Sequence, residues 1–204
     1  MHTPETNGSA QLILDGISYE LPILIGSEGE RTIDIRKLLS TTGYTVLDNG
    51  FKNSASCTSS ITYLDGDKGI LRYRGYAIED LAENCTFVEV AYLLLHDKLP
   101  NAQELLDFRT LLGDFALLHE DMLHFFDHFP ASAAPMSILS VMVNSLVNFY
   151  PEMSNNPREN IDTIACRLIS KIRAIAAFSY KMSIGEPLIY PRHDLTYVGN
   201  FLNM

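Results

Sequence analysis

One stretch, residues 54–82, constrains the fold of this 204-residue chain more than any other. Two short runs rich in β-branched and aromatic residues, 61–64 and 70–73, flank a loop at residues 65–69 that contains two glycines. Glycine readily adopts the positive φ that a reversing loop needs, so this pattern predicts a β-hairpin. A helical pattern begins at Ala77. The stretch therefore predicts a strand–turn–strand–helix junction.

The sequence on either side of this junction differs in character. Residues 1–10 are mostly polar and are expected to be a disordered tail. Short alternating apolar runs predict a small β-rich region over residues 11–73, which includes the hairpin. From residue 74 onward the apolar period becomes helical, so residues 74–204 are expected to form a helical domain. The predicted fold class is mainly α, with a small β-rich region before the helices.

Two capping boxes mark the next two helix starts after the helical pattern that begins at Ala77. In a capping box, a hydroxyl or amide side chain and a glutamate three residues later satisfy free backbone donors. The pairs with this spacing are Thr86 with Glu89 and Asn101 with Glu104. The apolar run 87–95 predicts a buried helix after the first box. The helix after the second box is expected to run past Leu112, bend at Gly113, and stop before Pro130.

Three further helices are expected toward the carboxyl end. Pro135 suits a first helical turn, and the run 136–149 is mostly apolar, as in a buried helix. Residues 156–159, Asn-Pro-Arg-Glu, carry the signals of another helix start. Apolar residues then recur on one predicted face: Ile161, Ile164, Ala165, Leu168, Ile172, Ile175 and Ala176. Asp194 can cap a last helix.

Composition narrows the class of protein. Hydrophobic residues make up 47% and charged residues 20%, as in ordinary globular proteins. The formal net charge of -10 argues against a nucleic-acid partner, because such surfaces need clustered Lys and Arg. No apolar run approaches the ~18 residues that cross a bilayer, and residues 1–10 lack a secretory signal. Three widely spaced cysteines fit a reducing compartment. We therefore expect a cytoplasmic protein without a membrane partner.

Several motifs together resemble one family. The run D-G-D-x-G-I-L-x-x-R-G-Y-x-I-x-x-L-A, residues 65–82, is similar to a segment of citrate synthases. Residues 22–38 are similar to the amino-terminal segment of the hexameric Gram-negative bacterial type. Further family segments are matched, in the family's order, by residues 51–57, 183–187, 190–192 and 194–204. The resemblance begins at about Leu12. It implies a multihelical citrate-synthase-like fold that is truncated, because the last residues match the middle of the family's chain. We therefore expect an amino-terminal part.

The resemblance also implies an activity for the full-length enzyme. Citrate synthase, a transferase of the tricarboxylic acid cycle, condenses acetyl-CoA, oxaloacetate and water into citrate and CoA. These are substrates, and no cofactor is expected. The enzyme is expected to be a homo-oligomer, a dimer or a hexamer. A 2-methylcitrate synthase, acting on propionyl-CoA, is the nearest alternative, and the β-rich region favours citrate synthase over it. A non-catalytic helical interaction module is an alternative from another class.

By the same resemblance, no catalytic residue lies in this chain. The family's two catalytic histidines and its aspartate match segments beyond Met204. The 204 residues alone are therefore expected to be inactive.

The resemblance implies one candidate site within the chain. NADH-inhibited members bind the nucleotide at positions that match Tyr150, Arg167 and Lys171, so an allosteric NADH site is a hypothesis here. From spacing alone, Arg167 and Lys171 would instead be read as a solvated helix face. The sequence Asp114-Phe115-Ala116 stands where the family has Arg-His-Thr. Weak NADH regulation is therefore expected.

A cluster of histidines was the other candidate. His124 and His128 are four residues apart, so on a helix they could share a metal. His119 does not complete an H-E-x-x-H pattern with them. We expect no metal site and interpret these histidines as solvated or as lying at the edge of the core.

Overall fold

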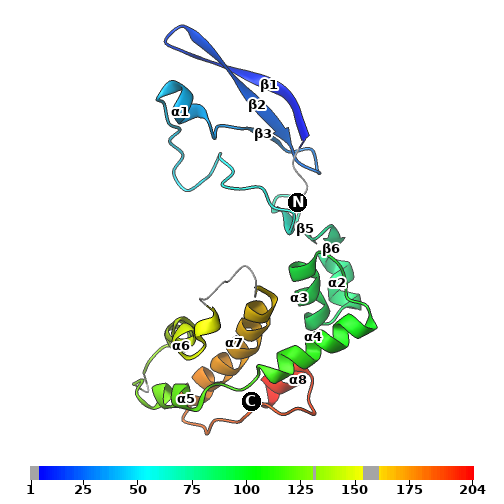
Figure 1. Ribbon diagram of the computed structural model, residues 1–204, viewed down its shortest axis with the longest axis vertical. Helices are drawn as coiled ribbons and strands as arrows, with labels where there is room; N and C mark the ends of the chain where they lie inside the picture. The colour runs from blue at the N-terminus through cyan, green and yellow to red at the C-terminus, as the bar shows by residue number, and fades with distance from the viewer. Residues whose placement is uncertain (1–4, 131, 154–160) are drawn as a thin grey trace. The chain divides into compact units, whose positions relative to one another are not determined.

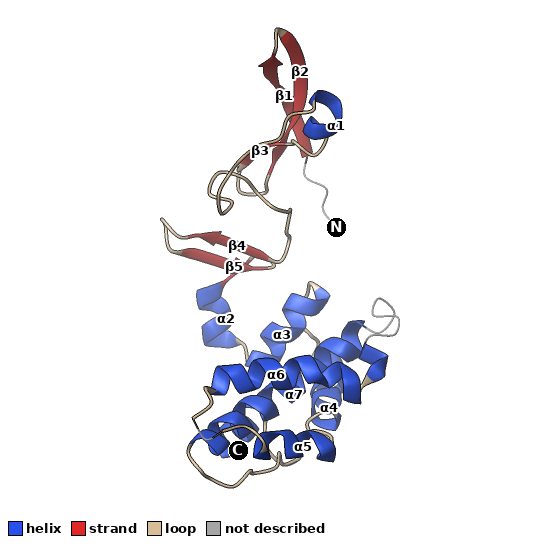
Figure 2. Ribbon diagram, turned by 90° about the vertical axis from the view of Figure 1, so that its left-hand side faces the viewer, coloured by secondary structure: helices blue, strands red, loops and turns tan. Residues whose placement is uncertain are grey.

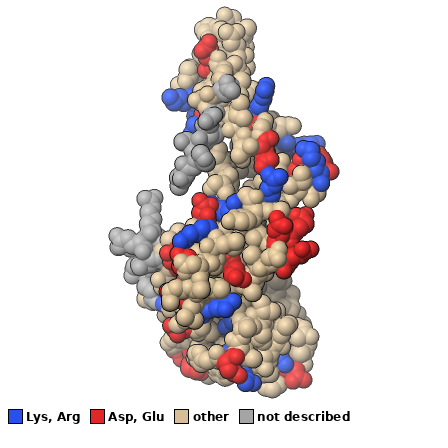
Figure 3. Space-filling model, turned by 90° about the vertical axis from the view of Figure 1, so that its right-hand side faces the viewer, with Lys and Arg blue, Asp and Glu red and all other residues tan. Residues whose placement is uncertain are grey.

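The computed structural model describes residues 5–130, 132–153 and 161–204. The chain divides into two compact units, Met1–Thr62 and Tyr63–Met204, each of which is described by itself. Figure 1 labels the helices and strands, and Figure 2 separates them by colour. Figure 3 shows basic and acidic side chains interspersed on one face of the described chain.

The first unit is built on a three-stranded antiparallel sheet. Its strands are β1 (Glu5–Leu14), β2 (Ile17–Ile25) and β3 (Arg31–Ile33), in the order β1-β2-β3, and the short helix α1 (Leu38–Thr42) follows. A tight turn joins the first two strands, with positive φ at both Asp15 (52°) and Gly16 (80°). The register pairs Leu12 with Tyr19 and Leu14 with Ile17.

The predicted disordered tail is wrong for residues 5–10. These residues form the first half of β1, where Glu5 pairs with Ile25 and Ala10 with Leu21. The register shifts between Thr6 and Ser9, around Gly8 with its φ of 91°. A ladder of backbone hydrogen bonds does not need apolar side chains, so a polar edge strand leaves no apolar signal in the sequence. Residues 1–4 lie outside the described residues.

The predicted hairpin is confirmed. Strands β4 (Thr62–Asp65) and β5 (Ile70–Tyr73) are neighbours in a second three-stranded sheet, which β6 (Tyr76–Ala77) completes. Helix α2 (Ile78–Asn84) follows directly. The boundary between the units falls at residues 62 and 63 rather than at 73 and 74, because β5 and β6 pack with α2.

The remaining helices are α3 (Phe87–His96), α4 (Ala102–Asp114), α5 (Glu120–Asp127), α6 (Pro135–Phe149), α7 (Ile161–Ser183) and α8 (Tyr197–Asn203), with a 3₁₀ turn η1 (Pro151–Met153). Both predicted capping boxes are present, at the starts of α3 and α4. Pro135 begins α6 as predicted. Among the described residues, no helix is both long and apolar enough to cross a membrane.

Two helix boundaries differ from prediction. The single helix expected to approach Pro130 is two helices, because α4 ends at Asp114 and α5 begins anew with His119 as its cap. Thr196, not Asp194, caps α8, since its Oγ1 accepts a hydrogen bond from Gly199 N at 3.0 Å. Asp194 instead pairs with Arg192. The helix start predicted at residues 156–159 lies outside the described residues.

The main core lies where α5 and α6 pack against α7. Its fully or almost fully buried side chains include Met122, Phe126, Ile138, Met142, Leu146, Ile175 and Phe178. Figures 1 and 2 both show α6 beside α7. The isoleucine stripe predicted for α7 is only partly buried, because Ile161 and Ile172 are exposed while polar residues of the same helix are covered. The buried polar residues of α7 include Lys171, which belongs to the candidate site described below.

Candidate functional site

The two candidate cations of α7 are not on a solvated face. Lys171 has only 2% of its surface exposed, and Arg167 is partly buried. The segment that follows α4 and the ring of Tyr150, just after α6, lie against them. The interpretation from spacing alone is therefore wrong, because it took no account of what packs on this side of α7.

The ammonium group of Lys171 contacts two backbone carbonyls and one aromatic ring. Its Nζ donates a hydrogen bond to the Leu117 carbonyl at 2.6 Å and a longer one to the Phe115 carbonyl at 3.4 Å. It also lies 4.2 Å from the centre of the Tyr150 ring, within the range of a cation–π contact. Burial, and next the positive charge of Arg167, lower the pKa of Lys171 to about 8. The amine is thus still mostly protonated at neutral pH but loses its proton far more readily than an exposed lysine.

Arg167 shares the same aromatic partners. Its guanidinium carbon lies 4.7 Å from the centre of the Phe115 ring and 4.9 Å from that of Tyr150. Burial raises the pKa of Tyr150, which favours the neutral phenol. The structure therefore brings together the three residues singled out from the sequence and adds Phe115. We call these four residues the Tyr150 cluster.

The Tyr150 cluster has little free capacity for an anion at Lys171. The ammonium already has two carbonyl acceptors and an aromatic face, and almost none of it reaches solvent. A phosphate could reach this group only if the segment 115–118 moved. In the arrangement observed, Lys171 joins α7 to the end of α4.

A cavity of about 540 Å³ lies on another side of α7, where the start of α3, the end of α4 and residues 191–200 meet. Asp114, exposed at the last position of α4, and Arg173 of α7 both line it. Arg173 is only 6% exposed, and burial lowers its pKa. Its Nη1 donates to the Tyr197 carbonyl at 3.2 Å, and its guanidinium lies 4.4 Å from the centre of the Tyr197 ring.

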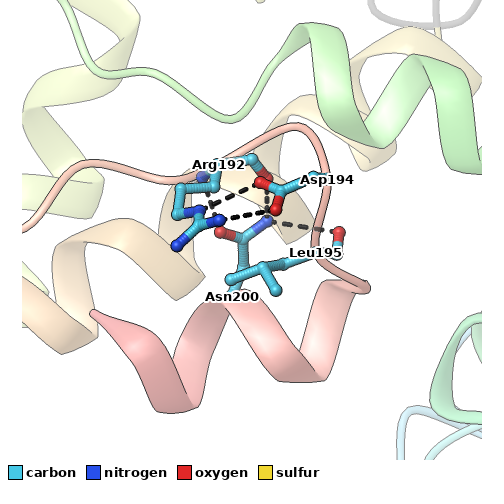
Figure 4. A network of polar contacts seen from close by, with 4 residues as sticks. All are labelled: Arg192, Asp194, Leu195 and Asn200. Carbon is cyan, nitrogen blue, oxygen red and sulfur yellow. Dashed lines mark hydrogen bonds and ion pairs between the residues drawn. The ribbon is translucent and has the colours of Figure 1, made fainter.

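The side chain of Asn200 holds the loop that forms one wall of this cavity through hydrogen bonds to the loop backbone. Its Oδ1 accepts a hydrogen bond from Arg192 N at 2.7 Å, and its Nδ2 donates to the Arg192 carbonyl at 2.6 Å and to the Leu195 carbonyl at 3.5 Å. Arg192 in turn donates hydrogen bonds from Nε and Nη2 to the carboxylate of Asp194, as Figure 4 shows. The loop that precedes α8 is thereby fixed in shape.

Sequence reasoning missed Arg173 and Asn200. A charged residue within the apolar stretch Ile-Arg-Ala-Ile-Ala-Ala was a signal for Arg173, because buried charges usually need a specific partner. Asn200 carried no such signal, since its two hydrogen-bonding partners come from the irregular loop before it.

The histidine segment does not assemble a metal site. His119 caps α5, its Nδ1 accepting a hydrogen bond from Asp121 N at 3.2 Å, and His124 lies near Asp127 with most of its side chain exposed. Among the described residues, no three His, Cys, Asp or Glu side chains are placed to hold a metal ion together.

Comparison with known proteins identifies the family that this chain matches. Residues 50–204 match the family model described as citrate synthase, C-terminal domain. The chain is 44% identical over 202 residues to citrate synthase 1 of Mycobacterium tuberculosis, in both strain CDC 1551 / Oshkosh and strain ATCC 25618 / H37Rv. The match covers 98% of this chain and 47% of each relative. The chain therefore spans about half the length of these curated relatives.

Solved structures agree. Citrate synthase from Thermotoga maritima is 34% identical with a TM-score of 0.67, covering 78% of this chain and 41% of that one. Citrate synthase from Pyrobaculum aerophilum is 30% identical with a TM-score of 0.67, covering 89% and 44%. The Thermoplasma acidophilum enzyme, 23% identical with a TM-score of 0.70 over 78% and 42%, supports the fold alone. The predicted fold class, a truncated and mainly helical citrate-synthase-like fold with small β-sheets ahead of the helices, is confirmed. The chain belongs to the citrate synthase family.

Proposed function

We propose that this chain is the amino-terminal part of an enzyme that condenses acetyl-CoA, oxaloacetate and water into citrate and CoA. The observation that carries the proposal is the 44% identity to citrate synthase 1 over 98% of the chain. We further propose that the enzyme is of the hexameric Gram-negative bacterial type, as the motif at residues 22–38 suggests. The family's acid–base pair would form the enol of acetyl-CoA, and its arginines would stabilise charge on the substrates.

The test compares the full-length enzyme with residues 1–204. CoA release from acetyl-CoA is followed with a thiol reagent, with and without oxaloacetate. We expect oxaloacetate-dependent turnover from the full-length enzyme and none from residues 1–204. Loss of a general base alone removes a factor of about 10²–10⁴, and loss of substrate positioning removes more. Turnover by residues 1–204 clearly above the blank would contradict the assignment of all catalytic groups to the other part.

Propionyl-CoA in the same assay separates the nearest alternative. A 2-methylcitrate synthase would prefer propionyl-CoA, whereas we expect a higher kcat/KM with acetyl-CoA. The β-rich first unit favours citrate synthase. Absence of turnover with either thioester in the full-length protein would leave the non-catalytic interaction module as the better description.

We propose that NADH binds the full-length enzyme weakly or not at all. Arg167 and Lys171 are engaged by the rings and carbonyls of the Tyr150 cluster, and Lys171 is covered. Asp114 stands where the inhibited relatives are expected to carry a cation. Exchanging attraction for repulsion near a phosphate changes binding by about 2 kcal/mol, roughly thirty-fold in affinity.

NADH titration of the full-length enzyme tests this, with Asp114→Arg as the second variant. Weak binding that Asp114→Arg strengthens is the expected result. Tight binding by the unmodified enzyme, unchanged by the substitution, would show that Asp114 does not face the nucleotide.

We also propose that the full-length enzyme is a homo-oligomer, a dimer or a hexamer. In support, helix α6 leaves Met136 72% exposed, and Val141 and Val147 are also exposed. Exposed apolar groups of this kind commonly mark surfaces that other chains cover. Residues 1–204 alone are accordingly expected to self-associate or to be poorly soluble. A sharp monomer peak in size-exclusion chromatography, with cooperative thermal unfolding, would count against this expectation.

A further inference from the structure

The guanidinium of Arg173 has an unused hydrogen-bonding edge beside the cavity. Among the described residues, its one hydrogen bond runs from Nη1 to the Tyr197 carbonyl, and it makes no ion pair. Its Nε is shielded from solvent and has no acceptor. Native proteins rarely leave a buried charged donor in this state, because the lost hydration is not replaced.

Two other arginines of this chain show what that edge binds. Arg36 donates from Nε and Nη2 to the carboxylate of Asp34 at 2.9 and 2.6 Å. Arg192 donates from Nε and Nη2 to Asp194 at the same two distances. Nε and Nη2 form the side of the guanidinium that matches the two oxygens of one carboxylate. On Arg173 this side has no hydrogen-bond partner among the described residues.

The remaining lining of the cavity is mixed. Arg109, Arg192 and His193 contribute basic groups, and Asp114 contributes one carboxylate. Arg192 is already neutralised by Asp194, so Arg173 and Arg109 are the cations without an ion pair among the lining residues described. The apolar part of the wall comes from residues such as Phe87, Leu112, Leu117, Leu195 and Val198. A volume of about 540 Å³ lies within the range of small-molecule sites.

We propose that this cavity binds a small organic carboxylate with an apolar body, whose two oxygens accept hydrogen bonds from Nε and Nη2 of Arg173. A small rotation of the guanidinium presents this edge to the cavity. The apolar wall covers the body of the ligand, and Arg109 adds attraction at the rim. Tyr150, Arg167 and Lys171 do not line the cavity, so Asp114 is the one residue that this proposal shares with the proposed weak NADH binding, and the proposal is independent of citrate synthesis.

The probe is benzoate, with benzamide as its uncharged counterpart and inorganic phosphate as an anion without an apolar body. Binding to the full-length enzyme is measured by isothermal titration calorimetry. The side-chain Nε–Hε signals of arginine are followed by ¹H–¹⁵N NMR. We expect benzoate to bind at least tenfold more tightly than either comparator, because a charged, bidentate hydrogen bond adds to apolar burial. One Nε–Hε signal should shift, and that signal should be absent from Arg173→Gln.

Matched variants distinguish this cavity from the rest of α7. Arg173→Gln should weaken benzoate binding at least tenfold, whereas Arg167→Gln, on the same helix but outside the cavity, should leave it unchanged. Asp114→Asn removes the one carboxylate among the lining residues described. Because that carboxylate repels the anion, the substitution should strengthen benzoate binding about threefold.

Equal binding of benzoate and benzamide would overturn the proposal, as would tight benzoate binding that survives Arg173→Gln. Preferred binding of phosphate over benzoate would also overturn it. Should Arg173→Gln fail to fold, the wild-type NMR titration and Asp114→Asn decide: no shifted Nε–Hε signal, or no gain in affinity, refutes the site.

Discussion

Lys171 offers a quantitative test of how burial acts on this helix. It is 2% exposed, and burial, followed by the charge of Arg167, lowers its pKa from 10.5 to about 8. Because the pKa is lower in the folded chain, the unfolded chain binds more protons between pH 8 and pH 10.5. The free energy of unfolding therefore rises with pH across this window, and the full penalty applies below pH 8.

The magnitude follows from the two pKa values. They differ by about 2.5, and a difference of one corresponds to about 1.4 kcal/mol, so the ammonium costs the folded state about 3 kcal/mol at low pH. Most of this cost disappears within a pH range in which unfolding can be measured. Between pH 7.5 and pH 9.5, Lys171 should contribute a rise of about 2 kcal/mol.

Urea unfolding of the wild type and of Lys171→Met, at several pH values in this range, isolates that contribution. Tyrosines titrate in both proteins, so their effect cancels in the difference. Methionine also leaves the Phe115 and Leu117 carbonyls without their donor, but that cost does not vary with pH. The free energy of unfolding of Lys171→Met, measured relative to that of the wild type, should therefore fall by about 2 kcal/mol from pH 7.5 to pH 9.5. The ¹³Cε signals of the six lysines report the same pKa directly.

A difference that stays constant over this range would refute the reasoning. A Lys171 Cε titration with a midpoint at or above 10.5 would do the same. Either result would mean that the two carbonyls and the Tyr150 ring compensate fully for the water that the ammonium has lost.

Two further substitutions test the packing of α7, both by chemical denaturation. Leu146→Ala in α6 removes a side chain with no exposed surface from the main core and should cost about 3 kcal/mol; a loss below about 1 kcal/mol would mean that the core collapses around it. Ser170→Ala removes a buried hydroxyl that donates to the Leu112 carbonyl at 2.7 Å and should cost about 1–2 kcal/mol, whereas Ser183→Ala removes a solvent-exposed hydrogen bond to the Tyr180 carbonyl of its own helix and should have almost no effect. Equal effects of the two serine substitutions would show that the bond to α4 adds nothing.

Local signals in the sequence predicted the elements that depend on local chemistry. The hairpin rests on strand formers and loop glycines, and each capping box on two residues three apart, so the residues that specify these features are the ones that form them. Strand β1 was missed over residues 5–10 because its partner is β2, and pairing through the backbone leaves no mark on a polar segment.

The candidate site was predicted only in part, for a related reason. The family resemblance pointed to Tyr150, Arg167 and Lys171, and these residues do meet. Their burial could not be predicted from the spacing along α7. It depends on the segment after α4, more than fifty positions away in the sequence, which supplies the Phe115 ring and the carbonyls of Phe115 and Leu117.

The end of α4 explains why polar residues of α7 are buried. A helix leaves its last four carbonyls without partners inside the helix. Here the Leu111 and Gly113 carbonyls accept hydrogen bonds from the backbone N–H groups of the next turn, those of Phe115 and Ala116. The Leu112 carbonyl accepts one from the hydroxyl of Ser170.

Lys171 continues this pattern one step further along the chain, where the Phe115 and Leu117 carbonyls have already left the helix. Its positive charge is also favourable near the negative end of the α4 dipole. The stop at Asp114 follows Gly113, and α7 supplies donors to carbonyls that a local cap would otherwise satisfy. Lys171 and Ser170 thus bind the end of α4 and the next residues to α7, where Phe115 lies in the Tyr150 cluster and Asp114 lines the cavity.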